Sequence, residues 1–189
     1  MWKSRAIRIY ISIIIWLLIS PALADVTKLG GLDIKTEPTP KDWKYFHAMS
    51  PRDHQNLWER HEESGIKFRD WSWSWRIGWI RVCTFRPEDY CQGLLIGGLW
   101  DQALLVRAEA AYRIGNRYAG TENTSAIEIL TKAFSNGKNW RNGKPLKIQN
   151  KIIHALYKIG GEGGVLAAKS LAASSDDTKV YFSKLQKQN

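Results

Sequence analysis

The sequence predicts an all-α protein in which antiparallel helical hairpins stack as a short α-solenoid-like array or an irregular helical bundle, closed by one disulfide. Helix start and stop signals are frequent along the chain, and strand signals are nearly absent. A short pattern also recurs, as "WSWRIG" (73–78), "AAYRIG" (110–115) and "ALYKIG" (155–160). The copies lie 37 and then 45 residues apart, which is the spacing of paired-helix repeats.

The first 24 residues have the pattern of a secretory signal peptide. Lys3, Arg5 and Arg8 precede a short apolar run, and "PALA" offers an A-x-A-like cleavage site. The apolar run is shorter than the roughly 20 residues that a membrane span needs. We therefore expect a periplasmic or secreted protein with no stable transmembrane segment after cleavage.

Residues 25–42 are rich in Gly, Pro and charge, and they predict a flexible leader. We expect one helical domain over residues 43–189. Its first clear helix spans about 51–63, because Ser50 is a good N-cap, Pro51 suits the first helical position and Gly65 is a typical stop.

The stretch "DWSWSWRIGWIRVC" (70–83) contains four tryptophans. Its alternation fits a strand, yet Trp71, Trp75 and Trp79 recur every four residues, as on one face of a helix. The repeated pattern places Trp75 where Tyr112 and Tyr157 stand. We expect the indole rings to pack between helices, with Trp71 or Trp73 partly exposed.

Each of the last two copies is followed by a turn and a second apolar helix. Apolar stripes run over residues 126–133 and 165–171. A final capping helix is predicted to begin after Ser175 or Asp176.

This arrangement resembles the HEAT-type helical repeat, whose first helix commonly ends in a basic-x-x-A-x-x-A-L-x-x-[IL]-G pattern. The resemblance covers residues 100–186 well and residues 66–99 poorly. Residues 139–147, "NWRNGKPLK", depart from it as an inserted basic loop.

The two cysteines, Cys83 and Cys91, predict a disulfide, because an exported chain with an even number of cysteines favours one. No cofactor or metal site is predicted. His54 and His61 could share a helical face, but without a matching carboxylate pattern we expect two solvated histidines.

Residues 82–101 are similar to a local pattern of periplasmic immunity proteins that neutralise type VI secreted wall amidases, roughly C-x-G-x-x-x-G-x-x-D. Cys91, Gly93 and Gly97 match it, while Asp101 falls one residue late. The resemblance implies an inhibitor of a wall-degrading toxin.

The chain has a net charge of +10, of which +7 remains after residues 1–24 are removed. For an exported protein this balance indicates a protein partner or an acidic component of the cell envelope rather than nucleic acid. The basic loop supplies the candidate partner-binding residues. They are Lys138, Trp140, Arg141, Lys144 and Lys147.

Common catalytic motifs such as G-x-S-x-G and H-E-x-x-H are missing, so we expect a non-enzymatic binding or adaptor protein. The alternatives are an immunity protein and a cell-wall-active glycoside hydrolase. The hydrolase would use Glu59, Glu62 or Glu63 as a general acid.

Overall fold

The computed structural model describes residues 28–188 of the chain, which divide into two compact units, 28–66 and 67–188. In these residues there are nine α-helices and two hairpins of two-residue strands. The predicted all-α class is therefore confirmed. The predicted signal peptide lies outside the described residues.

The first unit contains a hairpin of β1 (Lys28–Leu29) and β2 (Leu32–Asp33), followed by helices α2 (Pro40–Ala48) and α3 (Pro51–Ser64). The hairpin and the start of α2 fall within the segment 25–42, for which the sequence predicts a flexible leader. Leu29, Leu32 and Ile34 of this Gly- and Pro-rich segment are buried, so the segment has an apolar side.

Helix α3 matches its predicted bounds to within one residue at its end. The Ser50 hydroxyl accepts a hydrogen bond from the Asp53 backbone amide at 3.2 Å, and the Asp53 carboxylate accepts one from the Ser50 amide at 3.2 Å. Gly65 closes the helix with a φ of 69°. The predicted capping residues thus satisfy the free backbone groups at both ends of the helix.

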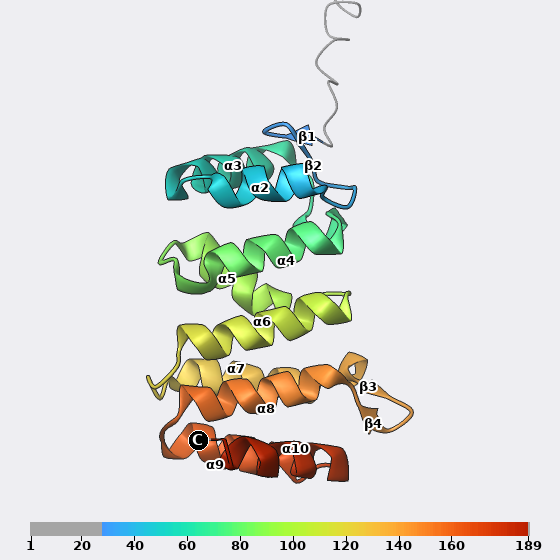
Figure 1. Ribbon diagram of the computed structural model, residues 1–189, viewed down its shortest axis with the longest axis vertical. Helices are drawn as coiled ribbons and strands as arrows, with labels where there is room; N and C mark the ends of the chain where they lie inside the picture. Colours follow the sequence, from blue (N-terminus) through green and yellow to red (C-terminus); the bar gives the residue numbers. More distant parts are fainter. Residues whose placement is uncertain (1–27, 189) are drawn as a thin grey trace, which may run out of the picture. The chain divides into compact units, whose positions relative to one another are not determined.

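The second unit is a stack of helical hairpins. Helices α4, α6 and α8 lie side by side in Figure 1, α7 packs against α8 and α9, and α10 packs against α8 and α9. The predicted antiparallel arrangement and the final capping helix are confirmed. The helices of this unit are α4 (Trp73–Val82), α5 (Asp89–Gly98), α6 (Leu104–Arg117), α7 (Thr124–Phe134), α8 (Lys147–Ile159), α9 (Gly161–Ala172) and α10 (Asp176–Gln186).

Three of the four tryptophans of the 70–83 stretch lie inside and one is partly exposed, as predicted. Trp71, Trp75 and Trp79 are at most 2% exposed, whereas Trp73 is 42% exposed. The rings of Trp71 and Trp79 meet edge to face with centroids 6.3 Å apart. Buried aromatics of this size supply much of the driving force for folding.

The disulfide between Cys83 and Cys91 joins the short turn η3 (Cys83–Phe85), which follows α4, to α5. The two Cα atoms are 4.8 Å apart, and both cysteines are fully buried. The predicted pairing is therefore present in the core of the second unit.

Helices α6 and α8 approach each other closely at Gly115. A Cβ atom placed on Gly115 would lie 2.6 Å from the Ala155 Cα atom and 2.7 Å from its Cβ atom. Only glycine therefore fits at this point of the stack.

We predict that Gly115→Ala lowers the free energy of unfolding by about 1–3 kcal/mol, because α6 and α8 must separate to admit the methyl group. Urea unfolding measures the change. Gly93→Ala is the matched control, because a Cβ there meets nothing within 4 Å and the better helix former should stabilise α5 by up to about 1 kcal/mol. Equal effects of the two substitutions would contradict the close approach.

A second prediction concerns His154, whose Nδ1 lies 3.2 Å from the Tyr181 hydroxyl oxygen across the α8–α10 contact. Burial and the charges of Lys151 and Lys158 lower the pKa of His154 below its ordinary value of 6.5. Below pH 6.5 the unfolded chain therefore binds a proton that the native protein resists, and stability falls with pH until the native pKa is passed. In His154→Gln the free energy of unfolding, measured between pH 7.5 and 5, should fall less steeply than in the wild type.

Candidate functional site

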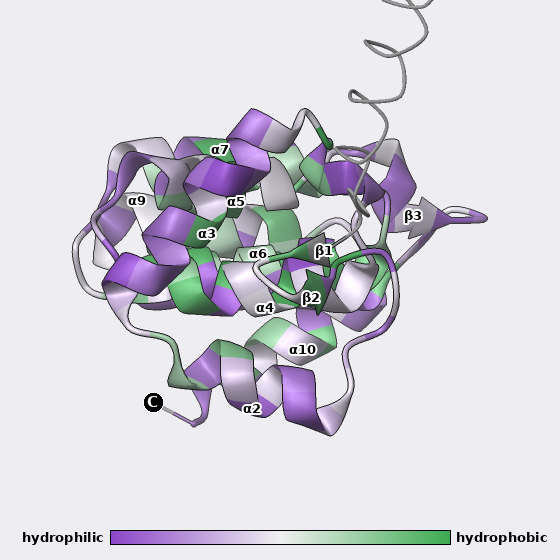
Figure 2. Ribbon diagram, turned by 90° about the horizontal axis from the view of Figure 1, so that it is seen from above, coloured by the Kyte–Doolittle hydropathy of each residue, from purple (hydrophilic) through white to green (hydrophobic). Residues whose placement is uncertain are grey.

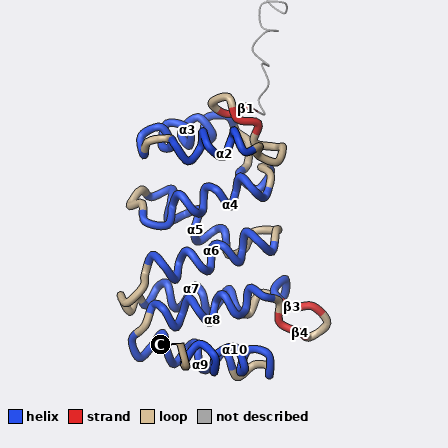
Figure 3. The backbone as a smooth tube through the Cα atoms, in the orientation of Figure 1, coloured by secondary structure: helices blue, strands red, loops and turns tan. Residues whose placement is uncertain are grey.

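The candidate partner-binding residues lie on and beside a hairpin, where the sequence predicts a loop. Strand β3 (Trp140–Arg141) pairs with β4 (Lys144–Pro145), and the hairpin follows the short turn η4 (Gly137–Asn139). Figure 3 shows it as the pair of short strands beside α8, and Figure 2 shows it projecting from the helices as a hydrophilic segment. We call residues 138–147 the basic hairpin.

The tip of the basic hairpin is a tight turn at Asn142 and Gly143, whose φ angles are +51° and +72°. Positive φ at both central residues is typical of the type I′ turn, which matches the twist of two short strands. The dipeptide Asn-Gly is the sequence signal for such a turn, and it could have predicted the hairpin.

Trp140 fixes the base of the hairpin rather than standing free at its surface. Its indole Nε1 donates a hydrogen bond to the Phe134 carbonyl oxygen at 3.3 Å, and the two rings meet edge to face with centroids 5.8 Å apart. The side chain is half-buried. Arg141 is the next residue of the strand, so its side chain points to the opposite side. The two residues therefore have different roles, and only Arg141 is freely exposed.

Asn139 is the second anchor of the hairpin, and it is fully buried. Its side-chain amide donates to the Ala133 carbonyl oxygen at 2.9 Å, while its side-chain oxygen accepts from Arg107 Nε at 2.8 Å. Its backbone oxygen accepts from the Leu146 amide at 3.0 Å, which closes the hairpin.

Arg107, on α6, connects Asn139 to residues 101 and 102, which precede α6. Its guanidinium donates to the backbone oxygens of Lys138, Asp101 and Gln102 at 2.8–3.0 Å. The side chain is 3% exposed, and burial lowers its pKa although the charge of Asp101 opposes the shift. The buried charge is tolerated because its donors are occupied.

Asp101 extends the same chain of contacts to α4. Its carboxylate accepts from Arg76 Nε at 2.8 Å and from Arg76 Nη2 at 3.0 Å, and both side chains are under 10% exposed. Arg76 also donates to the backbone oxygens of Arg69 and Trp71. We call Arg76, Asp101, Arg107 and Asn139 the buried polar network. It runs from α4 through α6 to the base of the basic hairpin, and no sequence motif marks it.

Four cations of the basic hairpin are exposed. They are Lys138, Arg141, Lys144 and Lys147. In the described part of the chain none of the four takes part in an ion pair. The hairpin therefore presents uncompensated positive charge on a fixed base.

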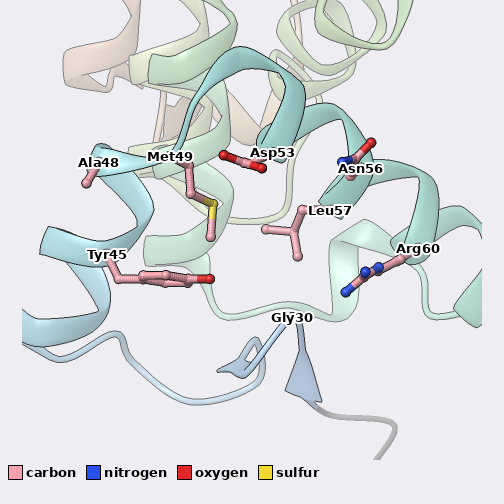
Figure 4. A pocket seen from close by; sticks show the side chains of 8 residues that line it. All are labelled: Gly30, Tyr45, Ala48, Met49, Asp53, Asn56, Leu57 and Arg60. Atoms are coloured by element: carbon pink, nitrogen blue, oxygen red, sulfur yellow. The ribbon is translucent and has the colours of Figure 1, made fainter.

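The three glutamates considered for a hydrolase lie on the exposed side of α3. Glu59 accepts a hydrogen bond from Gln55, and Glu62 accepts one from the Trp58 indole at 3.0 Å. None of the three lines the cleft of about 360 Å³ in this unit. Figure 4 shows Tyr45 and Arg60 on opposite sides of that cleft, with the apolar side chains of Met49 and Leu57 between them.

His54 and His61, expected to be solvated, are buried at 2% and 5% exposure, so this expectation is wrong. The His54 ring packs edge to face on Phe46, and the His61 ring contacts Trp58. Burial lowers the pKa of His61. The sequence shows the shared helical face but not the aromatic side chains that cover it.

Among residues 28–188, no group of three or more His, Cys, Asp or Glu side chains could hold a metal ion. The helices in that range are each too short or too polar to cross a membrane.

The positions that resemble the immunity proteins fall on and after α5. Gly93 and Gly97 lie one turn apart, and a Cβ on either would meet nothing within 4 Å, while Cys91 forms the disulfide. Asp101 belongs to the buried polar network. Comparison with models of known protein families, with curated proteins and with solved structures found no match for the chain.

The buried polar network yields a prediction about the hairpin. Asn139→Ala removes the partner of Arg107 Nε inside the protein, so it should lower the free energy of unfolding by about 1.5–3 kcal/mol. Hydrogen exchange of the Leu146 amide should become faster as the hairpin base loosens. Asn136→Ala is the control, because the Asn136 side chain is partly exposed and only caps the Lys138 amide, and water can replace that contact. Unchanged exchange at Leu146 in Asn139→Ala would contradict the anchoring role.

Proposed function

We propose that the protein is an exported, non-enzymatic binding protein that engages an acidic macromolecular partner through the basic hairpin. One observation carries this proposal: four exposed cations without an ion pair stand on a projecting hairpin whose base is anchored in the core. The partner class is a protein or an acidic component of the cell envelope, and nucleic acid is not expected. Export follows from the signal-peptide pattern of residues 1–24.

The anchored base supports binding by limiting the entropy lost on association. A loop that is already held in one conformation gives up less freedom when a partner docks. The clustered positive charge raises the rate of encounter with an acidic surface, and this effect weakens as salt increases. Trp140 acts here as an internal anchor, and the cations make the contact.

The more specific form of this proposal is a periplasmic immunity protein that blocks a wall-degrading toxin. The narrow, projecting shape of the hairpin favours it, because a segment of this kind can enter the cleft of an enzyme (Figure 2). The resemblance of residues 82–101 to the immunity proteins and the disulfide within that segment support the same interpretation. A HEAT-like origin of the stacked hairpins is compatible with both forms.

We predict that the double variant Arg141→Ala, Lys144→Ala lowers recovery of the partner from a cell-envelope extract at least fivefold at low salt. The loss should shrink at high salt, because charge steering is screened there. Immobilised wild-type protein, the variant and a control, Lys132→Ala with Lys169→Ala, are compared by quantitative mass spectrometry. Lys132 and Lys169 are exposed cations of α7 and α9, outside residues 138–147. Equal recovery with the hairpin variant and the wild type would overturn the proposal.

The hydrolase alternative has its own test. We expect no release of fragments from purified peptidoglycan by the wild-type protein, because Glu59, Glu62 and Glu63 lie on an open face of α3. Lytic activity that disappears in Glu59→Gln, Glu62→Gln or Glu63→Gln would replace the binding function by a catalytic one.

A further inference from the structure

A second surface with binding character lies across α4, α6 and α8. It is an open trough of about 400 Å³. Its lining residues are Trp73, Ile77 and Arg81 of α4, Leu105, Ala108, Glu109 and Tyr112 of α6, and Lys151 of α8. The trough shares no residue with the basic hairpin, so it is independent of the proposed function.

One part of the trough is apolar and exposed. Trp73 is 42% exposed and Leu105 is 56% exposed, while Trp75 and Ile114 on the same two helices are buried. A single exposed apolar side chain is ordinary, but two large ones from different helices that line one hollow form a patch that a partner can cover. Trp is also among the side chains that contribute most to binding at protein interfaces.

The other part of the trough is positively charged around Tyr112. The Arg113 Cζ and Lys151 Nζ atoms each lie 5.3 Å from the centre of the Tyr112 ring. A hydrogen bond with Asn116 lowers the pKa of the Tyr112 hydroxyl, and the charges of Lys158, Arg113 and Lys151 lower it further. The environment of this hydroxyl therefore favours a negative charge.

The acidic residue of the trough does not cancel this charge. Glu109 accepts hydrogen bonds from Arg81 at 2.9 Å and from Arg113 at 2.8 Å. Burial by itself raises the pKa of Glu109, but the two arginines outweigh it and the pKa is lowered. Two cations thus share one carboxylate, and the region remains positive with Lys151.

We propose that this trough binds an acidic peptide segment of a partner protein, with a bulky apolar side chain between Trp73 and Leu105 and a carboxylate near Tyr112 and Lys151. A peptide satisfies both parts of the trough, whereas a purely anionic polymer would leave the apolar part uncovered. A second copy of this chain is a poor occupant, because the net charge of +7 that remains without residues 1–24 makes copies repel each other.

The test is an NMR titration of the full-length mature protein, labelled with ¹⁵N, using a synthetic peptide in which two Glu-Glu pairs flank Leu-Phe. A second peptide carries Gln in place of each Glu. We expect chemical-shift changes to concentrate on residues 73–81, 105–112 and 151. The Gln peptide should bind at least tenfold more weakly.

Two matched double variants show whether peptide binding depends on the trough or on any exposed residues of the same types. Leu105→Ala with Lys151→Gln should lower the affinity for the Glu peptide at least fivefold. Leu166→Ala with Lys169→Gln should leave its affinity unchanged, although Leu166 is 55% exposed, almost as much as Leu105. All four positions are exposed, so both variants should fold. Circular dichroism verifies this.

Four outcomes would overturn the proposal. They are equal weakening by the two double variants, equal binding of the two peptides, shift changes confined to residues 138–147, and concentration-dependent self-association that the trough variant abolishes. Binding of the Glu peptide should be unchanged by Arg141→Ala with Lys144→Ala. The proposal for the trough and the proposed function of the basic hairpin can therefore be disproved independently of each other.

Discussion

The second unit depends on the requirement that buried charge be paired. Arg76 and Asp101 form a bidentate ion pair with almost no exposure, and Arg107 lies beside them with its donors bound to backbone oxygens and to Asn139. Removing any one member leaves another charge or dipole buried without a partner, which is more unfavourable than losing an exposed contact. The network thereby determines how α4, α6 and the basic hairpin are joined, and packing alone would not specify that arrangement.

Apolar packing supplies the driving force around this network. The buried tryptophans of 71–79 occupy the first layer of the second unit, and the contact of α6 with α8 at Gly115 brings the next layers close together. The exposed features, which are the cationic tip of the basic hairpin and the trough of α4, α6 and α8, stand on this rigid support. Binding surfaces on such supports lose little freedom on association.

Much of the fold follows from local sequence signals, and the candidate site follows from them only in part. The caps of α3, the burial of Trp75 and the pairing of Cys83 with Cys91 each depend on neighbouring residues or on composition, and the sequence predicts all three. The hairpin at 28–33 and the burial of His54 and His61 depend on side chains that only tertiary packing brings near. The link between Arg107 and Asn139 spans 32 residues and has no local pattern, so the basic residues of 138–147 could be named while their anchor could not.

The disulfide has a consequence for chemical access. Both cysteines are fully buried, and they bound a segment that runs from the turn after α4, at Cys83, into α5, at Cys91. A small thiol in solution can attack the bond only when that segment opens, because exchange requires contact with a sulfur atom. The bond is therefore cleaved by a mild reductant only as fast as this region opens in the native protein. The cleavage rate measures how often the first helical layer of the second unit, where the tryptophans are packed, opens.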